Sequence, residues 1–99
     1  MSADEQAVLV HVALPAATTG WDVVERLGER LAERVEVAGV GEFDGDVVGE
    51  GEATLYLYGP HADRLWEAVA DVVDLVSLPP GSYAEKRYGG PGARTVRVG

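Results

Sequence analysis

The order of strand-like and helix-like segments constrains the fold of this chain more than any other feature of its sequence. Two segments carry apolar residues at helical spacing, and they are separated by runs in which apolar and polar residues alternate as they do in strands. Glycine or proline marks most of the boundaries. The expected order is therefore strand, helix, strand, strand, helix, strand.

Each expected element has a range that follows from its residue pattern. Strands are expected over residues 7–14, 35–41, 53–58 and 82–88, a first helix over 21–34, a hairpin connection over 42–52, and a short fifth strand or an ordered tail over 94–98. A second helix is expected to open at Gly59-Pro60, with an apolar stripe that reaches Val73. This is the βαββαβ order of the ferredoxin-like fold, an α+β sandwich in which two helices cover one face of an antiparallel sheet.

The length and composition indicate one ordinary globular domain over residues 1–99. The chain is 46% hydrophobic and 25% charged, and it is long enough for one two-layer core. Residues 1–6 are polar and acidic, do not resemble a signal peptide, and are expected to be flexible. No apolar run approaches the roughly 20 residues that span a bilayer. We expect a cytoplasmic protein with no membrane partner.

The charge of the chain is unevenly distributed. Its formal net charge is −9, but residues 1–85 hold all 17 acids and only four arginines, whereas residues 86–99 hold four cations and no acid. An acidic body repels phosphate backbones, which argues against nucleic acid as a partner. It suits a basic protein partner, which the acidic surface would attract and mask.

One face of the expected sheet is unusually apolar and aromatic for a surface. If Val8, Val10, Val12, Leu55 and Leu57 face the helices, the alternation of strand residues places a second set on the open face. That set is Leu9, His11, Ala13, Thr54, Tyr56 and Tyr58. Such a face is rarely left bare in water, so we expect a second copy of the chain or a protein partner to cover it.

His11 is the one candidate for acid–base chemistry on this face. An imidazole titrates near neutral pH, which suits proton transfer. The alternative is a hydrogen-bonded histidine within a packed interface, and this is favoured because the sequence does not fix which nucleophile or carboxylate would be the partner of His11. We therefore assign no catalytic residue. The absence of cysteine excludes thiolate nucleophiles, disulfides and iron–sulfur clusters.

Three further segments are weaker site candidates. Lys86, Arg87 and Arg94 flank a Gly-rich turn whose backbone N–H groups would cradle an anion, although charge neutralisation of the acidic body is favoured. Asp44 and Asp46 are reminiscent of the opening of a calcium loop, but the spacing that follows does not match an EF-hand, so a solvated hairpin is favoured. The loop 15–20 precedes a helix and would accept a small carboxylate, with a plain helix cap as the favoured interpretation.

Residues 53–63 (ATLYLYGPHAD) and 86–93 (KRYGGPGA) carry a family resemblance. They are similar to small uncharacterised bacterial proteins with a "YGPxAD…RYGxPGA" pattern. The resemblance covers most of the second half of the chain and implies the fold. It implies no activity and assigns a role to no residue.

The sequence thus predicts a small non-catalytic binding protein that uses no cofactor and acts through its open sheet face or its acidic surface. It would either mask a protein partner or regulate another protein in response to a small ligand. A protein regulated by a small ligand in this way would resemble an ACT domain. The alternative is an enzyme similar to dimeric α/β-barrel proteins, which enclose a small organic substrate between two sheets. There His11 would be the acid or base, and Tyr56 and Tyr58 would orient the substrate. An enclosed cavity beside His11 distinguishes the two.

Overall fold

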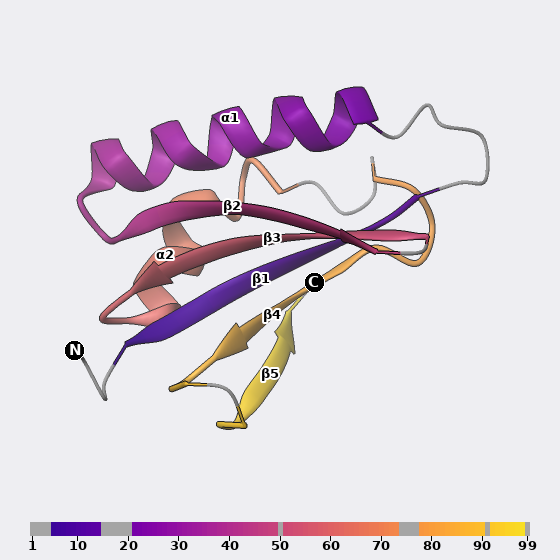
Figure 1. Cartoon of the computed structure of the whole chain (residues 1–99). Coiled ribbons are helices and arrows are strands. Elements are labelled where there is room, and N and C mark those ends of the chain that lie inside the picture. The colour runs from indigo at the N-terminus through magenta and orange to yellow at the C-terminus, as the bar shows by residue number, and fades with distance from the viewer. Residues whose placement is uncertain (1–4, 15–20, 50, 74–77, 91, 99) are drawn as a thin grey trace.

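The protein has an α+β fold in which two helices cover one face of a five-stranded antiparallel sheet (Figure 1). The computed structural model describes residues 5–14, 21–49, 51–73, 78–90 and 92–98. The elements are β1 (Gln6–Ala13), α1 (Trp21–Ala38), β2 (Glu42–Gly49), β3 (Glu52–Gly59), α2 (Ala62–Val69), β4 (Tyr83–Arg87) and β5 (Thr95–Val98). The strand order is β2-β3-β1-β4-β5, so β1 lies at the centre and the fifth strand extends the sheet beyond β4.

The core lies between the sheet and the two helices. The predicted inward residues of β1 and β3 are all fully buried, and they pack against Leu31 of α1 and Leu65 of α2. β1 pairs with β3 and with β4, and Val10 lies opposite both Leu55 and Ala84. Because paired residues point to the same side of a sheet, three adjacent strands contribute to one apolar layer.

The expected strand over residues 35–41 is wrong, because α1 continues through Ala38. Val35 is only 1% exposed and continues the buried stripe of α1, whereas Val37 on the other side of the helix is 81% exposed. Burial of Val35 at helical spacing therefore prevails over the preference of β-branched residues for strands. Gly39, with φ of 67°, ends the helix, and its N–H donates to the Val35 carbonyl at 2.9 Å.

The second strand lies instead within residues 42–52, which were expected to form only a hairpin connection. β2 is an edge strand paired with β3, and its register shifts between Phe43 and Asp46 as it does at a β-bulge. The side chains of Glu42, Asp44 and Asp46 are exposed. Charges and a bulge are devices that keep an edge strand from pairing with other chains, and they also hide its strand pattern from sequence reasoning.

The second helix is shorter than its apolar stripe predicts. Its N-cap is His61, so Pro60 precedes the helix instead of opening it. The Gln6 side chain accepts a hydrogen bond from the Ala62 N–H at 2.7 Å, so β1 satisfies a backbone group that the helix itself leaves free. Val72 is buried although it lies beyond the end of the helix. In the part of the chain that the structure describes, neither helix has the length and hydropathy needed to cross a membrane.

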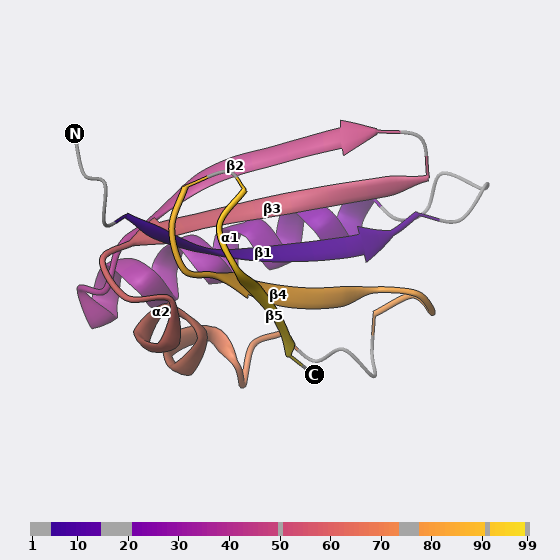
Figure 2. The same ribbon diagram turned by 90° about the horizontal axis from the view of Figure 1, so that it is seen from below.

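The fifth strand resolves the alternatives left open for residues 94–98. β5 pairs with β4, and Val98 lies opposite Ala84 and packs against the core. The hairpin formed by β4 and β5 lies on the side of the sheet away from α1 (Figure 1). Seen from below, β5 crosses in front of β4 (Figure 2). The hairpin therefore projects from the face of the sheet that the helices leave uncovered.

Candidate binding face

The candidate site is the face of the sheet opposite the helices, which we call the open face. The pairing register places Leu9, His11 and Ala13 of β1 beside residues of β3 on this face. In one row across the strands, His11 lies between Thr54 of β3 and Tyr83 of β4. The predicted set Leu9, His11, Thr54, Tyr56 and Tyr58 is thus brought together, and β4 adds Tyr83, Glu85 and Arg87.

His11 is enclosed by hydrogen-bonding and stacking partners. Its Nε2 atom lies 2.6 Å from a carboxylate oxygen of Glu85. Its Nδ1 atom lies 3.3 Å from the Thr54 hydroxyl and 3.5 Å from the Glu52 carboxylate. The ring also stacks on Tyr83, with 4.4 Å between the ring centroids and 18° between the planes. The side chain is only 13% exposed.

These contacts restrict the chemistry open to His11. An ionised carboxylate only accepts hydrogen bonds, so Nε2 donates to Glu85, and in the neutral ring Nδ1 accepts from the Thr54 hydroxyl. In the protonated ring Nδ1 donates, and the Glu52 carboxylate is close enough to balance the charge. Either way both ring nitrogens have partners within the protein.

Tyr56 and Tyr58 form the aromatic half of the open face. Their rings stack with centroids 6.2 Å apart and planes inclined by 13°. Both side chains are half-buried, as is Leu9, which lies opposite Tyr56 across the strands. The open face therefore combines a saturated polar cluster around His11 with a partly exposed tyrosine pair, a composition typical of protein-binding surfaces.

Two of the three predicted anion ligands, Lys86 and Arg94, lie over the same Tyr88 ring, and Arg87 lies on the other side of β4. Lys86 lies on the helix side, where its ammonium donates to Asp63 at 2.9 Å. Arg87, the next residue of the strand, lies on the open face, and its Nε donates to the Gly89 carbonyl. Arg94 lies with its guanidinium 4.8 Å from the centroid of the Tyr88 ring. The anion site stays a prediction, with its cations distributed around the hairpin.

Asp63 joins α2 to this hairpin. The Tyr88 hydroxyl donates to its carboxylate at 2.6 Å, beside the bond from Lys86. The bond from Tyr88, followed by that from Lys86, holds the pKa of Asp63 below its ordinary value. The same carboxylate raises the pKa of Lys86. These contacts connect α2 to the turn end of the β4–β5 hairpin.

The remaining candidates gain no support. Asp44 and Asp46 lie on the exposed edge strand β2, and among the described residues no three His, Asp or Glu side chains are grouped to hold a metal ion. The predicted carboxylate site in loop 15–20 lies outside the described residues.

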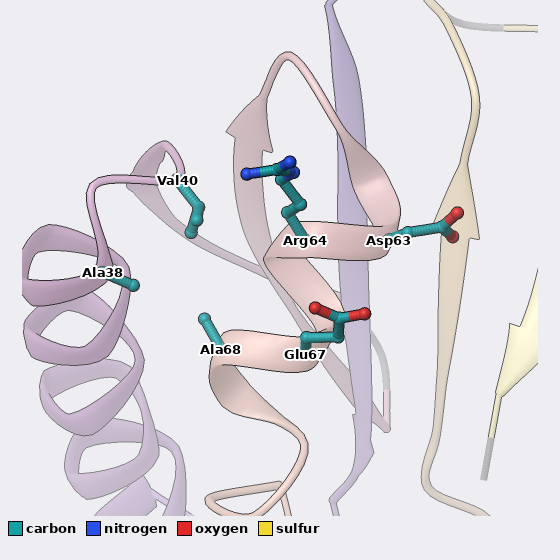
Figure 3. Close-up of a pocket in the computed structure, with 6 residues that line it drawn as sticks. All are labelled: Ala38, Val40, Asp63, Arg64, Glu67 and Ala68. Carbon is teal, nitrogen blue, oxygen red and sulfur yellow. The ribbon is translucent and has the colours of Figure 1, made fainter.

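Described residues line two surface grooves on the helix side. One, of about 490 Å³, runs between the C-terminal end of α1 and the outer surface of α2 (Figure 3). Asp63, Arg64 and Glu67 are among the residues that line it, and the carboxylate of Asp63 extends toward β4 (Figure 3). The other, of about 370 Å³, is lined by residues that include Arg26, Arg30 and Asp71. Neither groove includes a residue of the open face.

Comparison with known proteins leaves the site to be interpreted from its own geometry. No protein-family model, curated protein or solved structure matches the chain.

Sequence reasoning missed the partners of His11. Glu85 and Tyr83 are 74 and 72 positions away in the chain, and only the pairing of β1 with β4 brings them to His11. The Arg97 guanidinium also lies 4.3 Å from the centroid of the Tyr83 ring. The usable signal was the alternation of residues 83, 85 and 87, which places them on one face once β4 is set beside β1.

Proposed function

We propose that this chain is a ferredoxin-like module with an added edge strand, and that it is a non-catalytic binding protein whose open face binds a second copy of the chain. The observation that carries this proposal is the half-buried tyrosine pair Tyr56 and Tyr58 on the face that no helix covers. Two stacked aromatic rings are costly to leave in water, and a dimer built on them would bury them.

The cluster around His11 supports a binding role because it gives the open face an ordered centre. In His11 one nitrogen is bound to Glu85 and the other is beside Thr54 and Glu52. Such a network stiffens the centre of the face, and a pre-ordered surface loses less conformational freedom on binding.

The test is the absolute mass in solution, measured by size-exclusion chromatography with light scattering. We expect wild type at twice the chain mass of 10.5 kDa. Tyr56→Glu should be monomeric, because the change buries a carboxylate in the contact. The matched control is Val37→Glu, which adds the same charge at an 81% exposed position of α1 and should leave the dimer intact.

Two results would contradict the proposal. If wild type is monomeric at all concentrations, the chain does not self-associate. If the Tyr56→Glu variant is folded by circular dichroism and still dimeric, the open face is not the dimer contact.

A second candidate is an enzyme in which His11 acts as acid or base within the dimer. It is favoured by one observation, the 2.6 Å bond between His11 and Glu85, since a carboxylate commonly orients a catalytic imidazole. This candidate requires an enclosed cavity beside His11 in the dimer. A dimer structure in which packed side chains fill that space would overturn it.

A further inference from the structure

We infer that, in the dimer, the cationic β4–β5 hairpin of each copy docks against the acidic β2–β3 hairpin of the other. The inference rests on the proposed function and adds to it which parts of the two copies meet. Its basis is the separation of charge between the two edges of one sheet.

The two hairpins carry opposite charge. The β2–β3 hairpin holds acids and no lysine or arginine, whereas the β4–β5 hairpin holds four cations and one acid. The described acids are Glu42, Asp44, Asp46 and Glu52, and the cations are Lys86, Arg87, Arg94 and Arg97. In the strand order, β2 and β5 are the two edges of the sheet, so the acidic and the cationic strand lie at opposite edges. A surface of this kind is complementary to a second copy of itself.

Within each copy Lys86 is bound to Asp63 on the helix side, and the charge that stays available is that of the arginines. Arg94 and Arg97 are exposed, and each guanidinium lies over a tyrosine ring, which positions it without neutralising it. The hairpin's single acid, Glu85, is already bound to His11. On the other hairpin, Glu42 is exposed and lies on the open face opposite Tyr58, whereas Asp46 lies opposite the core residue Leu55 on the helix side.

The shape of the molecule points the cationic hairpin toward a copy bound at the open face. The β4–β5 hairpin lies on the side of the sheet away from α1, and β5 crosses in front of β4 in the view from below (Figures 1 and 2). A copy on the open face would therefore meet this hairpin as well as the tyrosine pair. In a two-fold arrangement the contact between hairpins forms twice.

The same arrangement limits the repulsion between two chains of net charge −9. A row of exposed carboxylates lies along α1, on the opposite side of the sheet from the open face, and consists of Asp22, Glu25, Glu29, Glu33 and Glu36. Contact between open faces keeps these rows on the outer surfaces of the dimer. At ordinary ionic strength, charges separated by more than about 10 Å are largely screened from each other.

The experiment is a charge reversal with rescue. One variant carries Arg97→Glu, and the other carries Glu42→Lys, and both positions lie on the open-face side of the sheet. We expect each variant alone to dimerise at least tenfold more weakly than wild type, because like charges then face each other twice. In an equimolar mixture both contacts pair opposite charges again, so native mass spectrometry should show the mixed dimer in excess over both homodimers.

The outcomes separate the two proposals. If wild type is a dimer that Tyr56→Glu splits, but the reversal variants dimerise as wild type does or fail to combine, the open-face dimer stands and the hairpin contact is wrong. If the mixture forms assemblies larger than two chains, the closed two-fold contact is wrong. A monomeric wild type overturns the proposed function and this inference together. Circular dichroism of each variant shows that it is folded.

Discussion

At the scale of single residues, side chains far apart in the chain set each other's chemistry. The ring of His11 touches side chains from β3 and β4, and no partner comes from its own strand. Asp63 likewise receives both of its hydrogen bonds from the β4–β5 segment. Both sites depend on the sheet having formed before they acquire their properties.

The lowered pKa of Asp63 predicts how the stability of the fold changes at acidic pH. Its pKa lies below the ordinary value of 3.8 because the Tyr88 hydroxyl and then the Lys86 ammonium donate to the ionised form. A lowered pKa in the folded state stabilises the fold above pH 3.8, and this contribution is lost as the pH falls through the folded pKa. An NMR titration of the Asp63 carboxyl carbon should show a midpoint below 3.8, and Tyr88→Phe should raise it.

The control for this titration is Tyr83→Phe, which removes a hydroxyl that does not contact Asp63 and should leave the midpoint unchanged. An Asp63 midpoint that Tyr88→Phe does not move would show that the hydroxyl is not the cause. Asp71, whose pKa the Arg34 guanidinium lowers, should keep its own low midpoint in both variants.

At the scale of elements, the backbone of β3 passes very close to the segment that joins α1 to β2. A Cβ atom added at Gly59 would collide with the Val40 carbonyl oxygen and lie 3.2 Å from the Gly41 Cα. Both obstacles are backbone, which cannot move aside as a side chain does. The absence of a side chain at Gly59 is therefore a condition for the α1–β2 connection to pack on the end of β3.

Gly59→Ala should lower the free energy of unfolding by about 1–3 kcal/mol, the usual cost of inserting a group into a packed site. Urea denaturation followed by circular dichroism measures it. Gly49→Ala is the matched control, because a Cβ there meets nothing within 4 Å, and its stability should stay within about 0.5 kcal/mol of wild type. Equal stability of the two variants would show that the close approach is absent in solution.

At the scale of the whole molecule, one core joins all the main elements. Leu55 is fully buried and belongs to the single cluster that includes residues of both helices and of β1, β3 and β4. A chain of this length with one core is expected to unfold in a single cooperative step. No part of the sheet or of the helix layer should then unfold on its own.

Leu55→Ala should therefore lower the free energy of unfolding by about 2–5 kcal/mol while leaving the transition cooperative. Circular dichroism and tryptophan fluorescence should report coincident urea transitions. Val48→Ala, at a 41% exposed position of β2, should cost far less. Transitions that separate between the two probes would show that the layers unfold independently.

Particular residues show which parts of the structure could be predicted from the sequence. The alternation in residues 8–12 and 53–58 correctly predicted which side chains form the core, because a strand with one buried face must alternate. It misplaced β2, since acidic residues and a bulge on an edge strand remove the alternation. It also ended α1 too early, since Val35 and Val37 favour strands locally. The partners of His11 were out of reach because no local pattern specifies which strand lies beside β1.

The sequence by itself determined the α+β order of elements, the identity of the core and the uneven distribution of charge, because these follow from local periodicity and composition. Only the tertiary structure decided the ends of α1 and β2, the addition of β5 to the sheet and the cluster around His11. These depend on contacts between residues tens of positions apart, where burial and backbone pairing across the sheet outweigh local preference.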